Sequence, residues 1–162
     1  MKGKVLITQG TQPFAQRVGK LLDGQYEVCY GAAGDIPAVL LRNKNYLQLP
    51  VHTEAAFEHE VLRTCLDRAV DAVIPLGEKE MDLLGRARQL FTEYGIAIWL
   101  PDAAHPSGPG LLKNPDRRFP LVVVDRGVVM AGEQRSDLGT TLSGVFAEVN
   151  GEKELALCCI TD

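Results

Sequence analysis

The sequence predicts a mixed α/β fold, in which a parallel sheet with helices on both faces is followed by an antiparallel β-meander. Two observations support this prediction. Short apolar runs alternate with segments of helical apolar spacing, with short connections, through residue 101. After residue 118 the pattern changes to pairs of apolar runs separated by glycine-containing turns, which is typical of β-hairpins.

The first two predicted elements lie between Lys4 and Leu22. The apolar run at 5–7 predicts a buried strand, and the chain then breaks at residues 10–13. Beyond the break, apolar residues recur at helical spacing, at Phe14, Val18, Leu21 and Leu22. Gly24 is placed to end this helix. A strand, a tight turn with glycine and a helix form the opening unit of a doubly wound sheet.

The alternation of strands and helices continues to Pro101. Further strands are predicted at 26–30, 46–49, 71–76 and 96–100, and the short apolar segment 38–41 has no clear type. One helix is predicted from an N-cap at Thr53 to Ala69. A second follows Gly77 and aligns Met81, Leu84, Ala87, Phe91 and Tyr94 on one face. Alternation with short connections requires right-handed crossovers and a parallel sheet, so residues 1–101 are predicted to form a Rossmann-like domain.

Residues 102–118 are predicted to be a linker loop, because they hold three prolines and two glycines and show no sustained period. Residues 119–162 are predicted to be a β-hairpin extension packed on the same domain. Its first hairpin has a three-residue loop, Asp125–Gly127, and its second turns at Asn150-Gly151. The pattern leaves open two arrangements, in which the hairpins extend the first sheet or pack as a separate one.

Composition and charge exclude several classes of protein. The net charge is −4 and no basic stripe is interleaved with aromatic residues, so nucleic-acid binding is not expected. No apolar run approaches the roughly 18 residues of a membrane span, and polar residues interrupt the first run too soon for a signal peptide. The cysteines show neither CxxC nor zinc-ligand spacing, which predicts buried free thiols in a cytoplasmic protein: Cys29, Cys65, Cys158 and Cys159.

Two segments carry a family resemblance: VLITQGTQPFAQRVGKLL, and DAVIPLGEKEMDLLGRARQLFTEYGIAIWLP. Through them residues 4–101 resemble the pre-ATP-grasp domain, the Rossmann-like N-terminal domain of ligases similar to carbamoyl phosphate synthase and biotin carboxylase. In that family the following segment leads into the ATP-grasp fold, which binds ATP and magnesium. The residues after Pro101 contain no glycine-rich phosphate loop and no acidic and asparagine cluster suited to magnesium. The resemblance therefore implies a leading domain without the part that performs ATP chemistry.

Two loops follow predicted strands at the same edge of the sheet and supply the candidate ligand-binding residues, which are Thr8, Gly10, Thr11 and Gln12 in one loop and Gly77 and Glu78 in the other. Hydroxyls, an amide and free N–H groups at a helix start suit a carboxylate or phosphate. Glu78 could bind an amine or act as a base. Each has a structural alternative, in which Gly10 permits a tight turn, Thr11 caps the helix and Glu78 complements the helix dipole.

A nucleotide- or NAD(P)-binding protein, enzyme or sensor, is the alternative function. It would place the cofactor near Gly10, with Asp35 on the ribose. The GTQPFA segment departs from the GxGxxG pattern, because Gln12 and Ala15 replace the second and third glycines and Pro13 removes a donor. No cofactor is predicted.

No metal site or catalytic serine is indicated. The histidines at 52, 59 and 105 are not paired at i, i+4, and the serines at 107, 136 and 143 lack a GxSxG elbow. The basic pairs Arg86/Arg88 and Arg117/Arg118 are expected at the solvated surface.

We therefore expect a domain that is non-catalytic by itself and binds a small anionic ligand or a separate ATP-grasp chain. The C-terminal hairpins could also form a homodimer interface, because a meander leaves strand edges that must be covered. A structural subunit without any ligand is a third possibility.

Overall fold

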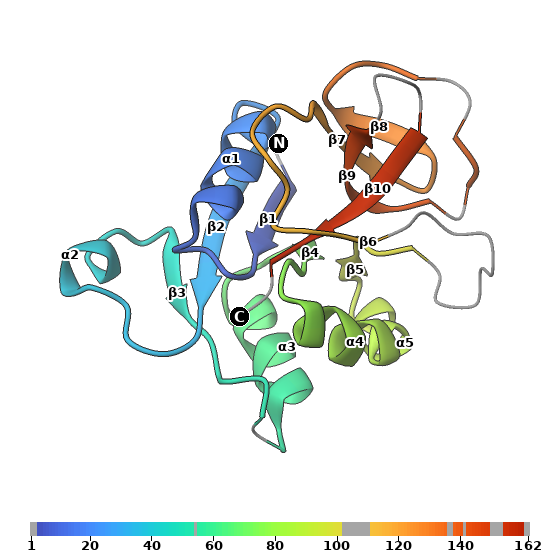
Figure 1. Ribbon diagram of the computed structural model, residues 1–162. Helices are drawn as coiled ribbons and strands as arrows, with labels where there is room; N and C mark the ends of the chain where they lie inside the picture. The colour runs from blue at the N-terminus through green and yellow to red at the C-terminus, as the bar shows by residue number, and fades with distance from the viewer. Residues whose placement is uncertain are drawn as a thin grey trace.

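The computed structural model describes residues 3–53, 55–101, 111–135, 138–140, 142–149 and 154–160. These residues form two five-stranded sheets (Figure 1). The first has the order β3-β2-β1-β4-β5 and is parallel throughout. The second has the order β6-β10-β9-β7-β8 and is mixed. The α/β class predicted from the sequence is confirmed.

Strands and helices of the first sheet alternate along the chain. The strands are β1 (Gly3–Ile7), β2 (Tyr26–Ala32), β3 (Tyr46–Gln48), β4 (Ala72–Ile74) and β5 (Ala97–Ile98). The helices are α1 (Pro13–Leu22), α2 (Ala38–Leu41), α3 (Phe57–Asp67), α4 (Glu78–Arg86) and α5 (Arg88–Glu93). Among the described residues, no helix is long and apolar enough to cross a membrane.

The sequence accounts for the β1–α1 unit directly. Val5, Leu6 and Ile7 are fully buried, because β1 is the central strand and both of its faces are covered. Pro13 stands in the first turn of α1, where its missing N–H has no helical partner to lose. Gly24 follows the helix with a φ of +94°, as predicted for the residue that ends it.

Two helix predictions are wrong in detail. Helix α3 begins at Phe57 with Ala56 as its N-cap, so Thr53 does not cap it. The helix predicted after Gly77 is two helices, because Ala87 leaves helical geometry between α4 and α5. Tyr94 lies beyond the end of α5 and is 56% exposed, so it does not continue the buried face.

The second sheet contains β6 (Leu111–Lys113), β7 (Leu121–Asp125), β8 (Val128–Ala131), β9 (Gly144–Val149) and β10 (Glu154–Cys159). The pairs β7–β8 and β9–β10 are antiparallel, as predicted, and β7 also pairs antiparallel with β9. The predicted turn at Asn150-Gly151 lies outside the described residues.

Two predictions about this sheet need correction. Residues 111–113, predicted as part of the linker, form β6, which pairs in parallel with β10. Parallel strands are not joined by a tight turn, so the pairing of β6 with the distant β10 leaves no hairpin pattern in the sequence. The first hairpin has a two-residue loop, because Asp125 pairs with Val128. Arg126 and Gly127 have φ of +47° and +81°, which is the pattern of a type I′ turn.

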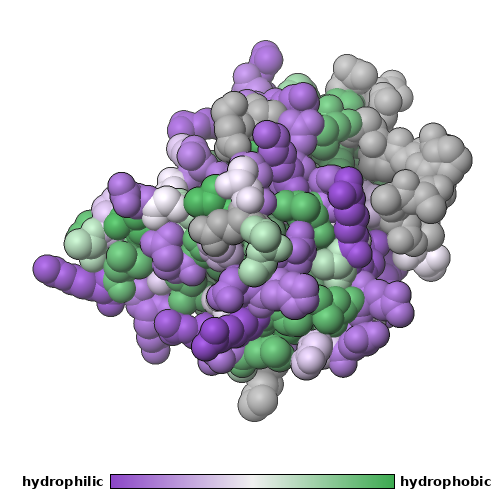
Figure 2. All heavy atoms as spheres, turned by 90° about the horizontal axis from the view of Figure 1, so that it is seen from below, coloured by the Kyte–Doolittle hydropathy of each residue, from purple (hydrophilic) through white to green (hydrophobic). Residues whose placement is uncertain are grey.

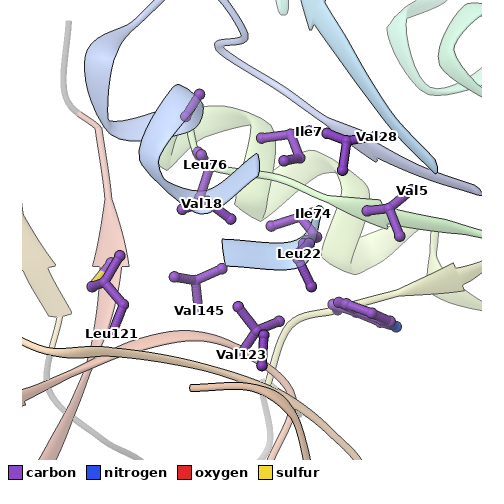
Figure 3. Close-up of a cluster of buried hydrophobic side chains, with 14 of the residues drawn as sticks. Val5, Ile7, Val18, Leu22, Val28, Ile74, Leu76, Leu121, Val123 and Val145 are labelled. Atoms are coloured by element: carbon purple, nitrogen blue, oxygen red, sulfur yellow. The ribbon is translucent and has the colours of Figure 1, made fainter. Parts of the chain in front are cut away.

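The second sheet packs on the first as a separate layer, which answers the question left open by the sequence. Helix α1 covers one face of the first sheet over β1, and α3, α4 and α5 pack on the opposite face. The core beside α1 contains Val5 and Ile74 of the first sheet together with Val123 and Val145 of the second (Figure 3). The second sheet therefore covers the part of the α1 face over β4.

The outer face of the second sheet is covered as well. Val122, Val124 and Phe146 are fully buried there against Leu138 and Leu142. Large exposed apolar residues occur at the sheet's edges, at Val128 on β8 and Leu111 on β6. This counts against the faces of the hairpin sheet as a homodimer interface.

Candidate functional site

The strand order reverses between β1 and β4, since the chain first adds strands on one side of β1 and then on the other. The crevice at the carboxyl ends of these two strands is the usual ligand site of a doubly wound sheet. Both predicted loops lie here, residues 8–12 after β1 and 77–80 after β4. The structure thus brings together the two groups of candidate residues.

Thr8 joins the two strands rather than facing a ligand. It is fully buried, and its N–H donates to the carbonyl of Ile74 at 3.1 Å. Its Oγ1 accepts the N–H of Leu76 at 2.8 Å. Both bonds hold the carboxyl ends of β1 and β4 in register, so the Thr8 hydroxyl has a structural role.

Gly10 is required by the close approach of β2. A Cβ at this position would lie 2.6 Å from Cβ of Tyr30 and 2.9 Å from the backbone nitrogen of Gly31. The Gly10 N–H donates to the carbonyl of Gly31 at 2.9 Å. The left-handed residue of the turn is Gln9, with a φ of +55°. The absence of a side chain at Gly10 therefore makes room for strand β2 and not for a ligand.

The central polar contact of the crevice is one that sequence reasoning missed. Nε2 of Gln9 donates to Oε1 of Glu80 at 2.7 Å, across the point where the strand order reverses. Glu80 lies in the first turn of α4 and is only 4% exposed. A Cβ on Gly77 would contact the Glu80 carboxylate and would lie 2.9 Å from Nε2 of Gln9. Gly77 thus leaves space for the Gln9–Glu80 pair.

The sequence places Gln9 and Glu80 in the two loops but does not signal their contact. Glu80 is the third residue of α4, and Gln9 stands in the loop directly after β1. Acidic residues in a first turn complement the helix dipole, which gives Glu80 an ordinary explanation as a surface residue. What identifies it as buried is the contact with a loop 71 residues away, which no local pattern contains.

The segment just after β10 pairs with the loop after β4, through a parallel bridge between Ile160 and Gly77 (Figure 1). The N–H of Ile160 donates to the carbonyl of Leu76 at 2.7 Å, and the N–H of Glu78 donates to the carbonyl of Ile160 at 3.3 Å. The first N–H of α4 is therefore bonded to the chain's own backbone. An anion at the start of α4 would have to displace Ile160.

Three of the candidate residues lie at the exposed rim of the crevice: Thr11, Gln12 and Glu78. Gln12 is the N-cap of α1 and makes no side-chain cap bond, so Thr11 is not the capping residue. Oε1 of Glu78 lies 3.5 Å from Nζ of Lys113, and both side chains are about half exposed. Such an ion pair contributes little to stability, because water screens it.

The remaining candidates lie outside the crevice or outside the described residues. Asp35 is exposed in the loop after β2, and Arg88 is half-buried and donates to the carbonyl of Leu100 at 2.6 Å instead of being solvated. Ser143 is buried and accepts the N–H of Arg126. His105, Ser107 and Ser136 fall outside the described residues. Over the described part of the chain, no three His, Cys, Asp or Glu side chains gather as a metal site would require.

The four cysteines are free and buried, as predicted from their apolar context. Burial raises the pKa of the Cys65 thiol to about 12, and it raises the pKa of Cys158 to about 12 in the same way. A thiol with so high a pKa stays protonated at neutral pH and is a poor nucleophile.

No known protein family has a model that matches this chain, and no curated protein matches it either. The geometry of the crevice and the sequence resemblance are therefore the basis for a functional proposal.

Proposed function

We propose that this chain is a stand-alone relative of the pre-ATP-grasp domain, non-catalytic by itself, that acts by binding a separate ATP-grasp chain. One observation carries the proposal. The crevice between β1 and β4, where a ligand of such a sheet would bind, is filled by the Gln9–Glu80 pair and by Ile160. A domain whose own side chains and backbone occupy its ligand site is better suited to binding a protein through the surrounding surface.

A small anionic ligand is the less favoured occupant of this crevice. The Glu80 carboxylate is buried at its centre, and Glu78 adds a second carboxylate at the rim. Two carboxylates repel an anion, most strongly where water is excluded. The first N–H of α4, which could have bound an anion, is already bonded to Ile160.

A nucleotide or NAD(P) is disfavoured by the first loop as well. In a dinucleotide fold the glycines let a pyrophosphate approach the backbone. Here the space beside Gly10 is taken by Tyr30 and Gly31 of β2, and Pro13 offers no N–H at the start of α1. Asp35 is exposed in the loop beyond β2.

The exposed rim supports binding of a partner chain. Thr11 and Gln12 present an exposed hydroxyl and amide in the loop after β1, and Glu78 forms an exposed ion pair with Lys113 at the start of α4. The two loops therefore offer neutral hydrogen-bonding groups and both signs of charge. Interfaces between separate chains commonly have such polar rims. In ligases of the resembled family, the leading domain works together with an ATP-grasp fold, which is the partner that the resemblance suggests.

The proposal is tested by copurification with a matched pair of variants. A tagged chain should copurify, from its own cells, with a protein that mass spectrometry identifies as an ATP-grasp enzyme. Gln12→Arg, at the rim, should abolish the association, while Gln25→Arg, exposed beyond the opposite end of α1, should retain it. The purified pair should then show ATP hydrolysis or ligation that depends on this chain.

A thermal-shift series on the chain alone covers the alternative. ATP, NAD(P), phosphate and small carboxylates should leave the melting temperature unchanged. A ligand at a hundredfold excess over its Kd would add about 2.7 kcal/mol of stability, which is easily detected. A clear shift with a nucleotide would overturn the proposal in favour of a cofactor-binding protein.

A further inference from the structure

One strip of the first sheet is left without a covering helix. In a doubly wound unit the β2–β3 connection normally places a helix over these strands. Here that connection holds only α2, four residues long with none of them buried, which stands beyond β3 (Figure 1). The result is a hollow of about 790 Å³ between the last turn of α1 and β2. Its lining includes Gly19, Asp23, Tyr26, Val28, Tyr30 and Asn45.

The wall of the hollow is held in place by several contacts. The Tyr30 ring stacks on Tyr46, with 5.1 Å between ring centroids and 26° between planes. The Tyr46 hydroxyl accepts a bond from Nε2 of Gln16 at 2.9 Å. The Tyr30 hydroxyl contacts Gly19, where any Cβ would overlap it. A glycine inside a helix is destabilising, so its presence here fits a wall that needs the Tyr30 ring in this position.

Helix α2 projects from the first sheet and carries exposed apolar side chains that could fill a hollow of this kind. Val39 is 70% exposed and Leu41 is 45% exposed, although both are large apolar residues. Figure 2 shows hydrophobic atoms at the end of the molecule where α2 lies in Figure 1, with hydrophilic side chains around them. An apolar helix with no fully buried residue is suited to packing against another surface.

The charges of the projection and the hollow are complementary. Arg42 and Lys44 follow α2 and Asp35 precedes it, so the projection carries one net positive charge. Asp23 and Glu27 line the hollow together with Lys20, which leaves one net negative charge. The hollow also lies at the C-terminal end of α1, where the helix dipole favours a cation. Asp23 lines the hollow together with Tyr30, so a carboxylate and a phenol hydroxyl both belong to its wall.

We propose that two copies of this chain form a two-fold symmetric dimer, in which α2 of each copy packs into the hollow of the other. The projection and the hollow are neighbours on one surface, because Asn45 lines the hollow and lies shortly after α2. A two-fold axis between them brings each projection to the other copy's hollow, so every favourable contact occurs twice. This interface differs from the hairpin edges, and it does not rest on the proposed function.

Sedimentation velocity on the full chain, over a range of concentrations, tests the dimer. The wild-type chain should be a dimer at high concentration and dissociate on dilution. Val39→Asp with Leu41→Asp should give a monomer at every concentration. Its melting temperature should equal that of the wild-type chain diluted to the monomer, because both side chains are exposed in the single chain. Val128→Asp, which alters an exposed valine at the β8 edge of the hairpin sheet, is the matched control and should remain dimeric.

Charge reversal identifies the two surfaces that meet. Arg42→Glu with Lys44→Glu should give a monomer, and so should Asp23→Lys with Glu27→Lys. Mixing the two variants should restore a dimer, because each projection then meets a hollow of opposite charge. A wild-type chain that stays monomeric at every concentration overturns the proposal. A dimer lost through Val128→Asp but kept in the α2 variants overturns it too, and assigns the interface to the hairpins.

Discussion

Gln9 and Glu80 form a hydrogen bond of 2.7 Å between the loop after β1 and the first turn of α4. The bond spans the place where the strand order of the first sheet reverses, and it lies beside the backbone contact of Gly77 with Ile160. A carboxylate as buried as Glu80 needs hydrogen-bond donors, because leaving it without them in a low-dielectric site is costly. The candidate crevice is thus also a structural junction.

Gln9→Ala should destabilise the chain by about 1–3 kcal/mol, because it removes a donor from a buried carboxylate. Glu80→Gln should cost less, since an amide oxygen can still accept the bond from Gln9. Urea unfolding of both single variants and the double variant gives the coupling energy between the two side chains. A coupling energy near zero would contradict the role assigned to this bond.

Gly10→Ala should be destabilising by about 1–3 kcal/mol, the usual cost of adding an atom to a filled site. The new Cβ would lie 2.9 Å from the backbone nitrogen of Gly31, and backbone cannot move aside as a flexible side chain can. Gly139→Ala is the control, because a Cβ there meets nothing within 4 Å. Equal stabilities of the two variants would show that the approach of β2 does not require a glycine at position 10.

The sequence predicts those parts of the fold that depend on residues close together along the chain. The buried run of β1, the spacing in α1 and the glycine at position 24 each act within a few residues. Strand β6 escaped prediction because its partner, β10, is distant and parallel. The break at Ala87 escaped because the apolar spacing continues through it and leads to the buried Phe91.

In the candidate site, too, the position of the loops was predictable from the sequence and the contacts between them were not. Sequence placed residues 8–12 and 77–78 at one edge, because the carboxyl ends of parallel strands lie together. It did not place Gln9 on Glu80, nor Ile160 beside Gly77, since both contacts join segments that only the folded chain brings together. The space beside Gly10 and Gly77, which the sequence pattern offers to a ligand, is taken by the protein's own atoms.

Gly19→Ala should lower the stability of the wild-type chain but raise the stability of a chain that carries Tyr30→Ala. In the wild-type chain the new methyl group overlaps the Tyr30 ring, so stability should fall. With Tyr30→Ala the overlap is removed, and the same change should stabilise helix α1 by about 0.5–1 kcal/mol, as glycine-to-alanine changes do in helices. Thermal unfolding of the wild-type chain, the two single variants and the double variant completes this double-mutant cycle. A loss of stability in both backgrounds would mean that something other than Tyr30 demands the glycine.

Arg126→Asn should stabilise the chain by about 0.5–1 kcal/mol, because asparagine tolerates the left-handed conformation better than arginine does. Arg126 and Gly127 form the type I′ turn between β7 and β8, for which Asn-Gly is the preferred pair. The ion pair with Asp125 that would be lost is exposed on the Arg126 side and contributes little. Arg126→Ala, which removes the charge without easing the backbone, should give no gain in urea unfolding.

Stability should fall at alkaline pH because of the buried cysteines. The thiols of Cys65 and Cys158 have a pKa of about 12 in the folded chain, above the ordinary value of 9.0. Between these values the unfolded chain releases protons that the folded chain keeps, so each thiol lowers the free energy of unfolding by up to about 1.4 kcal/mol per pH unit.

Urea unfolding of wild-type and Cys65→Ala chains, at pH 8 and at intervals above pH 9, isolates one of these thiols from the lysines and tyrosines that titrate in the same range. The variant should be less stable at pH 8, because it leaves a small cavity, and should lose less stability as the pH rises. In the native wild-type chain, a thiol reagent at pH 8 should react with Cys65 only as fast as the protein opens. Parallel pH profiles for the two chains would show that Cys65 ionises as freely in the folded state as in the unfolded one.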